Sequence, residues 1–383
     1  MNKAKIIAAV AASAIITGSF IAGCAESVSV NTGDIMRDID VAPTQTAAYE
    51  QYSKAVLDEY FAVANEHLDE GGDIDIEDEQ VVAAAIPAAA KLFAYACYNE
   101  RVLNQYVFFA SQEGDTDLST GSATALKQEY YLRVNEQEGI TCGYRYHYTI
   151  KKVMRSDGVL DNSILRGTFE SARTRITDET DLLYRLEGDN IKVGGKSKTL
   201  GIDMLECNWK TGSDWGVHDV IMRKSDFIEP DKIREDIENV AGEENITMRA
   251  NINILADDIL SNAVIAKDPG EEEGSGYLIF MTVNTEVANN DEASLKMLRK
   301  ANGSNDCEWV NEDGNSGLTI AFRIWDNGLF RMYSVSEKWQ GKISGFSGTA
   351  DSSTVYYYSY SDRDCDMTGY LKMLEEAKAS KGE

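Results

Sequence analysis

The chain has 383 residues, of which 64 are acidic and 37 basic, so its formal net charge is −27 at pH 7. Such an acidic protein repels nucleic-acid phosphates and anionic lipid headgroups, and it lacks the basic stripe that nucleic-acid binding requires. The length suffices for one large hydrophobic core or two smaller ones, and 19 Tyr, 11 Phe and 5 Trp residues supply the aromatic bulk.

The first 24 residues have the three zones of an export signal. Residues 2–5 carry two lysines, residues 6–21 form an apolar run without a charge, and Ala22-Gly23 then precede Cys24. The apolar run is too short for a comfortable membrane span, which favours a secretory signal that is removed. The alternative to lipid attachment at the end of this signal is an ordinary cleaved leader with an incidental cysteine.

The last four residues of this segment, Ile21-Ala22-Gly23-Cys24, resemble the lipobox of bacterial lipoproteins. That resemblance implies that residues 1–23 are the signal peptide and that the Cys24 thiol receives a diacylglyceryl group. It also implies that the new amino end often receives a further fatty acyl chain such as palmitate. Two or three chains anchor a protein stably, because each buried CH₂ contributes about 0.8 kcal/mol. We therefore expect Cys24 to be the lipid attachment site and the protein to sit at the extracytoplasmic face of the cell membrane or at the outer surface.

Residues 24–45 have the composition of a tether. Ser, Thr, Asn, Asp and Ala dominate this stretch, Pro43 lies near its end, and it shows no apolar periodicity. Removing Lys3 and Lys5 with the leader leaves 35 basic against 64 acidic residues. We expect the lipid, and not surface charge, to hold the protein at the membrane.

Five further cysteines are widely spaced and form no C-x-x-C pair: Cys97, Cys142, Cys207, Cys307 and Cys365. A disulfide-stapled exported domain normally has an even and denser set. One bridge would still fit, but we expect mostly free, buried thiols.

Residues 46–120 are predicted to be a helical segment. Tyr49, Tyr52, Val56 and Tyr60 recur at helical spacing, and Gly71-Gly72 ends this first helix. A second helix is predicted from about residue 77 to Ser111, and Pro87 should kink or split it. The two are expected to form an antiparallel helical hairpin.

Residues 121–383 are predicted to be a β-rich α+β domain. Apolar and polar residues alternate at 144–149, 320–325 and 356–360, which is the pattern of half-buried strands. Hairpin turns are predicted at 156–158, 188–190 and 326–328. Helices are predicted over 230–240, 291–300 and 368–378. This region is expected to form a mainly antiparallel sheet, either as one domain or as two sub-units divided near residues 230–240. The overall fold class is therefore α+β, and this layout resembles that of LolA-like lipoprotein carriers of the cell envelope.

Motifs for known chemistries are missing. The three histidines, His67, His147 and His218, lie outside any zinc-binding pattern, and the cysteines lack ligand spacing. No serine-hydrolase elbow or phosphate-binding loop is present. Acidic runs such as 73–77, 115–119 and 362–366 lack the glycine and the final glutamate of a calcium-binding loop. We therefore assign no catalytic residue, no metal site and no cofactor, and we leave the ligand-binding residues open.

Two function classes remain. The leading hypothesis is a non-catalytic envelope lipoprotein that binds an apolar or amphiphilic ligand, or a protein partner. The alternative is a surface enzyme that acts on glycans through a pair of carboxylates, since 64 acids make some such pair inevitable. Trp and Tyr residues could stack on sugars, but the five tryptophans, Trp209, Trp215, Trp309, Trp325 and Trp339, fit a core role better.

Overall fold

The structure of the protein is a computed structural model. It describes residues 36–118, 121–136, 139–154, 176–187, 190–199, 202–206, 259–268, 276–301, 306–312, 315–343 and 346–381. Cys24, the leader and the predicted helix over 230–240 lie outside these residues, as does the predicted turn at 156–158.

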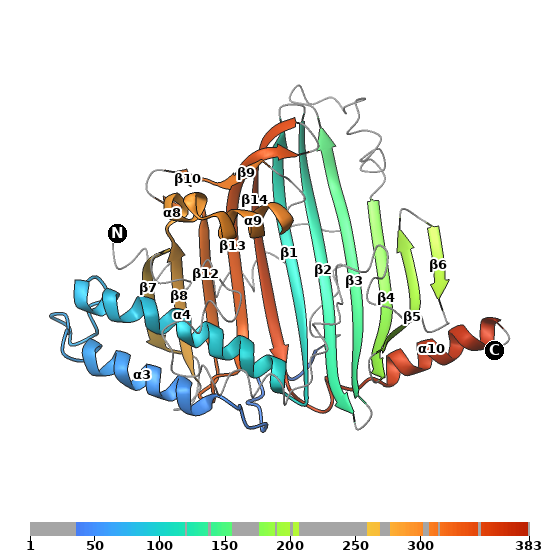
Figure 1. The fold of residues 1–383 in the computed structure, drawn as a ribbon, viewed down its shortest axis with the longest axis horizontal. Coiled ribbons are helices and arrows are strands. Elements are labelled where there is room, and N and C mark those ends of the chain that lie inside the picture. Colours follow the sequence, from blue (N-terminus) through green and yellow to red (C-terminus); the bar gives the residue numbers. More distant parts are fainter. Residues whose placement is uncertain are drawn as a thin grey trace.

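Two helices near the start of the described chain form the predicted hairpin. α3 spans Glu50–Ala64 and α4 spans Glu79–Val102 (Figure 1). The carboxylate of Asp78 begins α4, because it accepts hydrogen bonds from the backbone N–H groups of Gln80 (2.8 Å) and Val81 (3.3 Å). These are two of the N–H groups that every helix start leaves unpaired. α4 runs through Pro87 as one helix, so the proline does not split it.

The helical segment ends earlier than the sequence predicted. α4 stops at Val102 and strand β1, Gln105–Leu118, follows at once, so the expectation of helix to Ser111 and of a helical segment to residue 120 was wrong. Leu103 leaves the helix with extended backbone angles, φ −67° and ψ 148°. The residues that follow it are aromatic and β-branched, and this composition favours a pleated strand.

The described strands form a 12-stranded antiparallel sheet and a separate two-stranded ribbon, β10–β11. The sheet order is β6-β5-β4-β3-β2-β1-β14-β13-β12-β8-β7, and β9 pairs with β13 beside this path. After β1 the strands are β2 Gly121–Glu136, β3 Gly139–Met154, β4 Ile176–Glu187, β5 Asn190–Thr199, β6 Ile202–Glu206, β7 Leu260–Lys267, β8 Tyr277–Val283, β9 Cys307–Trp309, β10 Asn311–Glu312, β11 Asn315–Ser316, β12 Leu318–Ile324, β13 Phe330–Ile343 and β14 Phe346–Ser359.

One pairing unites the early and late strands. β1 and β14 lie side by side from the pair Val107 and Ser359 to the pair Leu118 and Gly348. Strands on both sides of residues 207–258 therefore belong to the same sheet. The predicted α+β fold with a large antiparallel sheet is confirmed.

Three further helices complete the described fold: α8 Thr285–Asn290, α9 Glu292–Ala301 and α10 Thr368–Lys381. α9 and α10 match the predicted helices at 291–300 and 368–378, whereas α8 was not predicted. The turn predicted at 326–328 joins β12 to β13, and Gly328 has φ 81° there, which glycine adopts without strain.

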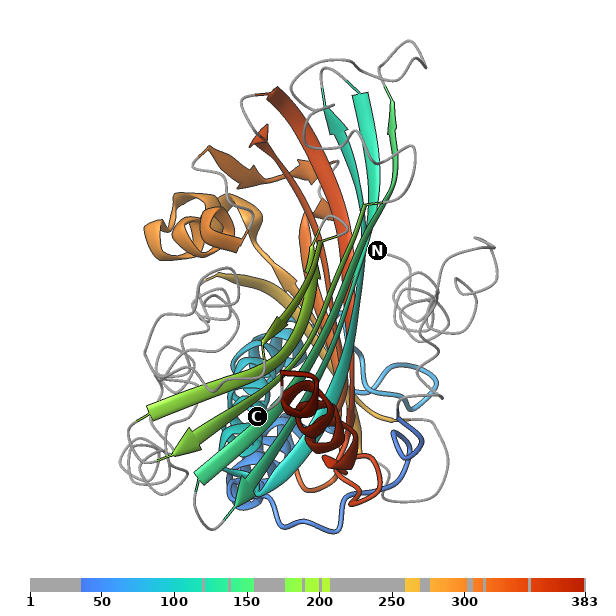
Figure 2. The same cartoon turned by 90° about the vertical axis from the view of Figure 1, so that its right-hand side faces the viewer.

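The helices cover opposite faces of the sheet. α3 and α4 pack on one face, where α4 contacts β7, β8 and β13. α10 lies on the other face, where the Tyr370 ring stacks on Tyr130 at 6.4 Å between centroids. Figure 2 shows the sheet nearly edge-on, with α3 and α4 on one side and α10 on the other. We call the side that carries α3 and α4 the helix face.

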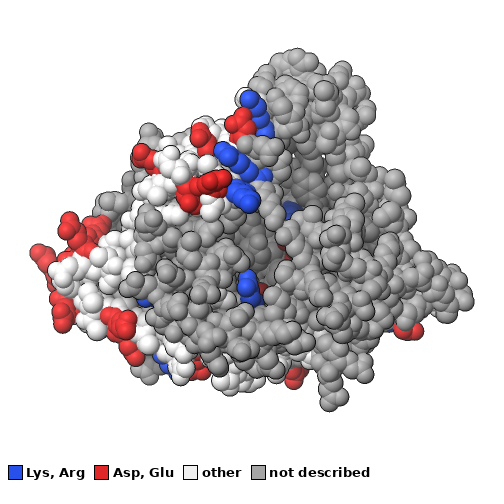
Figure 3. Space-filling view, in the orientation of Figure 1, with Lys and Arg blue, Asp and Glu red and all other residues white. Residues whose placement is uncertain are grey.

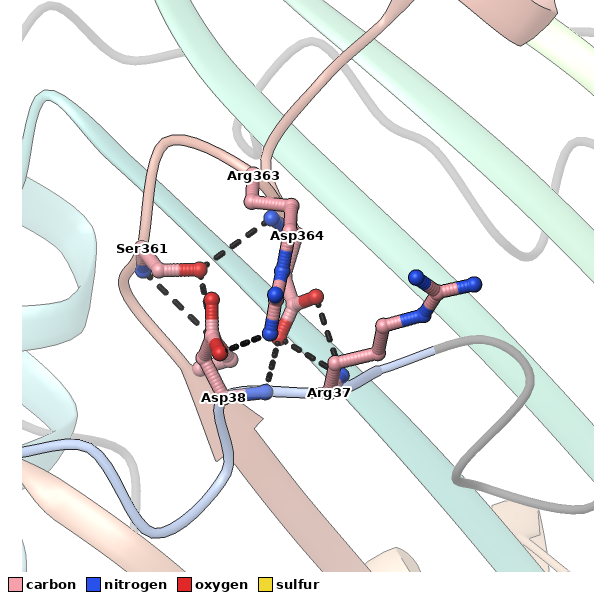
Figure 4. A network of polar contacts seen from close by, with 6 residues as sticks. Arg37, Asp38, Ser361, Arg363 and Asp364 are labelled. Carbon is pink, nitrogen blue, oxygen red and sulfur yellow. Dashed lines mark hydrogen bonds and ion pairs between the residues drawn. The ribbon is translucent and has the colours of Figure 1, made fainter.

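The first described residues are fixed to the body. Met36 is only 1% exposed and packs with Val107 and Leu132 on the face that carries α10. The Asp364 carboxylate accepts hydrogen bonds from the backbone N–H groups of Arg37 (3.0 Å) and Asp38 (2.8 Å), and Arg363 pairs with the Asp38 carboxylate (Figure 4). Residues 36–45, which the sequence analysis placed in the tether, thus have contacts that their polar composition did not predict. Any free tether can reach only as far as residue 35.

Candidate functional site

Aromatic side chains gather on the helix face where the early and late strands meet. In a strand, alternate residues point to one face, and the register places these residues in adjacent rows. Phe108 lies between Tyr358 and Tyr131, and Tyr356 lies beside Tyr333. We define the aromatic floor as Tyr106, Phe108, Tyr131, Tyr333, Tyr356 and Tyr358.

The rings of the floor touch one another in a continuous series. Tyr131 stacks on Phe108 with centroids 5.3 Å apart, Phe108 meets Tyr356 at 5.7 Å, and Tyr356 stacks on Tyr333 at 4.1 Å. Tyr333 in turn lies 5.7 Å from Phe93 of α4. The floor therefore begins at the helical layer and runs away from it across β13, β14, β1 and β2.

Part of this floor is half-buried and still reachable from solvent. Burial raises the pKa of Tyr356 to about 12 and raises that of Tyr333 well above its usual value. Nevertheless, Phe108, Tyr333 and Tyr356 keep partial solvent exposure. These three rings are therefore packed among their neighbours while part of each ring stays open to solvent. Figure 3 views the molecule from this side, and a few basic and acidic side chains are visible near its middle.

Glu100, in the last turn of α4, is the carboxylate nearest the end of the floor that lies under the helix. Tyr358 donates its hydroxyl to Glu100 Oε2 at 3.3 Å, and Tyr106 also hydrogen-bonds to this carboxylate. Burial raises the pKa of Glu100, although both tyrosine hydroxyls act in the opposite direction. The carboxyl group is thus held in place, and its protonated form is favoured relative to an exposed glutamate.

The β2 side of the floor carries the other polar groups. The hydroxyl of Tyr131 lies 3.1 Å from Cys142 Sγ, and Tyr144 donates its hydroxyl to Glu129 at 3.0 Å. Arg133 follows Tyr131 on the same face and lies between Tyr106 and Cys142 in the register. The floor is therefore an aromatic surface with charged groups at its margin, and this combination suits a ligand with both apolar and polar parts.

A hollow with a volume of about 460 Å³ lies at the end of β1 and β14, away from the aromatic floor. Residues 41–45, Asn104, Gln105 and residues 360–362 line it. Its amides hold the chain together: Gln45 Nε2 donates to the carbonyl oxygens of Gln105 (3.2 Å) and Tyr360 (3.0 Å), and Gln105 Nε2 donates to Asp362 at 2.5 Å. Polar and apolar groups both line this hollow, and its amide hydrogen bonds fasten the N-terminal segment to the body.

The residues considered for metal chemistry are not brought together. His67 pairs with Asp78 at 3.2 Å, and His147 lies within β3, while His218 falls outside the described residues. In the described parts of the chain, no group of three or more His, Cys, Asp or Glu residues could hold a metal ion. The cysteines that the structure describes are free thiols: Cys97, Cys142, Cys307 and Cys365. Cys207 lies outside the described residues.

The tryptophans that the structure describes serve the core. Trp309, Trp325 and Trp339 are 3%, 7% and 6% exposed, so they cannot form a sugar-stacking platform. α4 is long and apolar enough to cross a membrane by length and composition. It packs instead against the sheet, and much of its apolar surface is buried there.

Sequence reasoning missed the floor, Glu100 and Arg133. The alternation in residues 128–134 and the aromatic run 106–109 were signals of strands in this part of the chain. They could not show that β1 pairs with β14, and this pairing is what joins the tyrosines of the two regions.

Comparison with known proteins leaves the family open. No family model matches the chain, and no curated protein matches its sequence. Among solved structures, lipovitellin is similar over 67% of this chain, with 8% identity and a TM-score of 0.23, and this chain spans a quarter of the lipovitellin chain. A DUF1329 family protein from Desulfovibrio piger covers 74% of the chain at 10% identity, with a TM-score of 0.18 and 98% of its own length matched. An outer membrane lipoprotein-sorting protein domain from Vibrio parahaemolyticus covers 75% at 8% identity, with a TM-score of 0.19 and 99% of its own length matched. These scores are too low to support a functional argument.

Proposed function

We propose that the protein is an extracytoplasmic lipoprotein, anchored through Cys24, that binds an apolar or amphiphilic ligand on the aromatic floor. The observation that carries this proposal is the contiguous and partly exposed series Phe108, Tyr356 and Tyr333. Contiguous exposed apolar surface often marks an interaction site, and an apolar surface with a few polar groups at its margin is the usual lining of a small-molecule site. The floor needs no catalytic group for this role.

Binding of N-phenyl-1-naphthylamine, a neutral fluorescent apolar probe, tests the ligand part of the proposal. Tyr356→Ala should weaken binding about ten-fold, because it removes an aromatic contact from the centre of the floor. Tyr357→Ala is the matched control: Tyr357 is the next residue of β14 but packs on the opposite face. Equal effects of the two substitutions, or no probe binding by the unmodified protein, would contradict the proposal.

The anchor has its own test. We expect Cys24→Ser to abolish incorporation of a palmitate analogue in cells and to move the protein from the detergent phase to the aqueous phase. Continued labelling of this variant would refute lipid attachment at Cys24 without bearing on ligand binding.

The alternative, a glycan-active enzyme, requires two carboxyl groups about 5–10 Å apart. Burial raises the pKa of Glu100 and of Glu337, and both lie on the helix face, which would suit a general acid. However, Glu337 accepts a hydrogen bond from Ser352 (3.4 Å) and Glu100 one from Tyr358. Ser352 and Tyr358 are six residues apart on β14, about 20 Å at roughly 3.4 Å per residue. This pair is therefore too far apart for that chemistry.

A further inference from the structure

Arg133 is a buried cation at the margin of the aromatic floor. It is 3% exposed and lies on the helix face of β2, two residues after Tyr131 and opposite Tyr106 and Cys142 on the neighbouring strands. A charged side chain is almost never buried this deeply unless it is paired, because removing a charge from water is costly.

The guanidinium group is incompletely satisfied. Its Nε and Nη2 atoms are both buried and have no hydrogen-bond partner. Glu100 is close enough for its charge to act on Arg133, but its carboxylate accepts hydrogen bonds from Tyr106 and Tyr358. A buried donor without an acceptor costs free energy that a native protein recovers elsewhere, and for an arginine the natural acceptor is a carboxylate or phosphate oxygen.

We infer that Arg133 receives the anionic head group, a carboxylate or a phosphate, of an amphiphile whose apolar chain lies along the aromatic floor. This inference rests on the proposed function and adds the charge of the ligand to it. The rings mark a path for the apolar chain. From Arg133 the same face continues through Tyr131, Phe108 and Tyr356, whose successive ring centroids are 5.3 and 5.7 Å apart. A neutral hydroxyl head group could accept one hydrogen bond but would not balance the charge of the guanidinium group, and a cationic head group would face a like charge.

The head-group preference of the unmodified protein is the first test. Dodecanoate, dodecanol and dodecyltrimethylammonium share one alkyl chain, and each is used below its micelle concentration or solubility limit to displace N-phenyl-1-naphthylamine. We expect dodecanoate to displace the probe at a concentration at least about ten-fold lower than dodecanol, and the cation to be weakest. If dodecanoate and dodecanol are equal, the inference fails while the proposed function stands. If the probe does not bind at all, both fail.

Acetate separates the head group from the chain. It carries the same carboxylate as dodecanoate, and we expect no displacement at a thousand-fold higher concentration. Displacement by acetate at concentrations similar to those of dodecanoate would show a site for small free anions. It would contradict the inference that the ligand is an amphiphile.

Substitution of the arginine is the second test. Arg133→Met should remove the preference for dodecanoate over dodecanol while leaving dodecanol binding unchanged, and Arg133→Lys should retain part of the preference. Arg101→Gln is the control, because it removes an exposed positive charge next to Glu100 in the sequence and should leave the preference intact. Retention of the full preference in Arg133→Met would overturn the inference. Should that variant fail to fold, the head-group series on the unmodified protein still decides.

Discussion

The two halves of the sheet are built on different principles. β7, β8 and β12 are seven or eight residues long, and α4 covers them, so Ile279, Met281 and Phe322 are completely buried. β1, β2 and β3 have 14 to 16 residues, and Figure 1 shows them extending beyond the helical layer. Beyond α4, the helix face of these long strands carries mixed aromatic and polar side chains.

This difference explains where the partly exposed rings lie. Strands that end where α3 and α4 end give a closed core, whereas the longer strands extend past these two helices, which leave part of their face uncovered. The aromatic floor lies at this boundary, because Phe93 of α4 contacts Tyr333, and Phe108 lies beyond it. The closed core and the partly exposed aromatic floor are therefore parts of one continuous face of the same sheet.

The largest expected effect tests the covered half. Phe93 is 8% exposed and contacts Phe322 and Phe330 at 5.2 Å each. Phe93→Ala should destabilise the protein by about 3–5 kcal/mol, because it leaves a cavity between α4 and the sheet. Phe108→Ala, at the partly exposed floor, should cost less than half as much. Urea unfolding of both variants measures the contrast, and equal losses would show that the floor is as tightly packed as the core.

A smaller effect tests how α10 supports the long strands from the other face. A Cβ atom at Gly143 of β3 would lie 2.6 Å from Cε2 of the Tyr370 ring. Gly143→Ala should therefore push α10 away and destabilise the protein by about 1–3 kcal/mol. At Gly369 of α10 a Cβ would have no neighbour within 4 Å, so Gly369→Ala should be neutral or stabilise by up to about 1 kcal/mol. If Gly143→Ala has no effect on the unfolding midpoint in urea, the close packing of α10 on β3 is not important for stability.

The smallest effect concerns the first turn of α4. Hydrogen bonds, first that from the backbone N–H of Gln80, lower the pKa of Asp78. Its stabilising contribution is therefore present above the unfolded pKa of about 3.9 and is lost as the pH falls through the lower folded pKa. Asp78→Ala should lower the Tm at pH 7 by a few degrees, whereas Asp78→Asn keeps a capping side chain and should lower it less. Thermal unfolding at decreasing pH should show the difference between the native protein and Asp78→Asn disappearing in acid. A difference that persists in strong acid would contradict a role for the carboxylate charge.

Local sequence patterns predicted much of the fold. The hairpin of α3 and α4 follows from residues at helical spacing, and β3, β12 and β14 follow from strict alternation at 144–149, 320–325 and 356–360. The end of α4 was misplaced because the polar residues at 99–101 and 104–105 are as compatible with the exposed side of a continuing helix as with a break before a strand. Periodicity alone cannot separate a buried helix from a buried strand over so few residues.

Local sequence patterns could not predict the candidate site. Tyr131 and Tyr356 are more than 200 residues apart in the chain, and only the pairing of β1 with β14 brings their strands within one strand of each other. Likewise, Arg133 has the sequence context of an ordinary alternating strand. Its burial depends on neighbours from other elements.

What the sequence alone determined is local: the α+β class, most of the described helices, the alternation of β3, β12 and β14, the acidic charge that argues against nucleic-acid binding, and the lipobox that predicts a lipid on Cys24. These depend on the order of neighbouring residues, and so they can be recognised without a structure. The tertiary structure decided which face each strand shows to the helices, where the helical layer ends, and that a buried arginine adjoins a row of tyrosines. Those features depend on the register between strands that are distant in the sequence. This register is fixed by the simultaneous burial of many side chains.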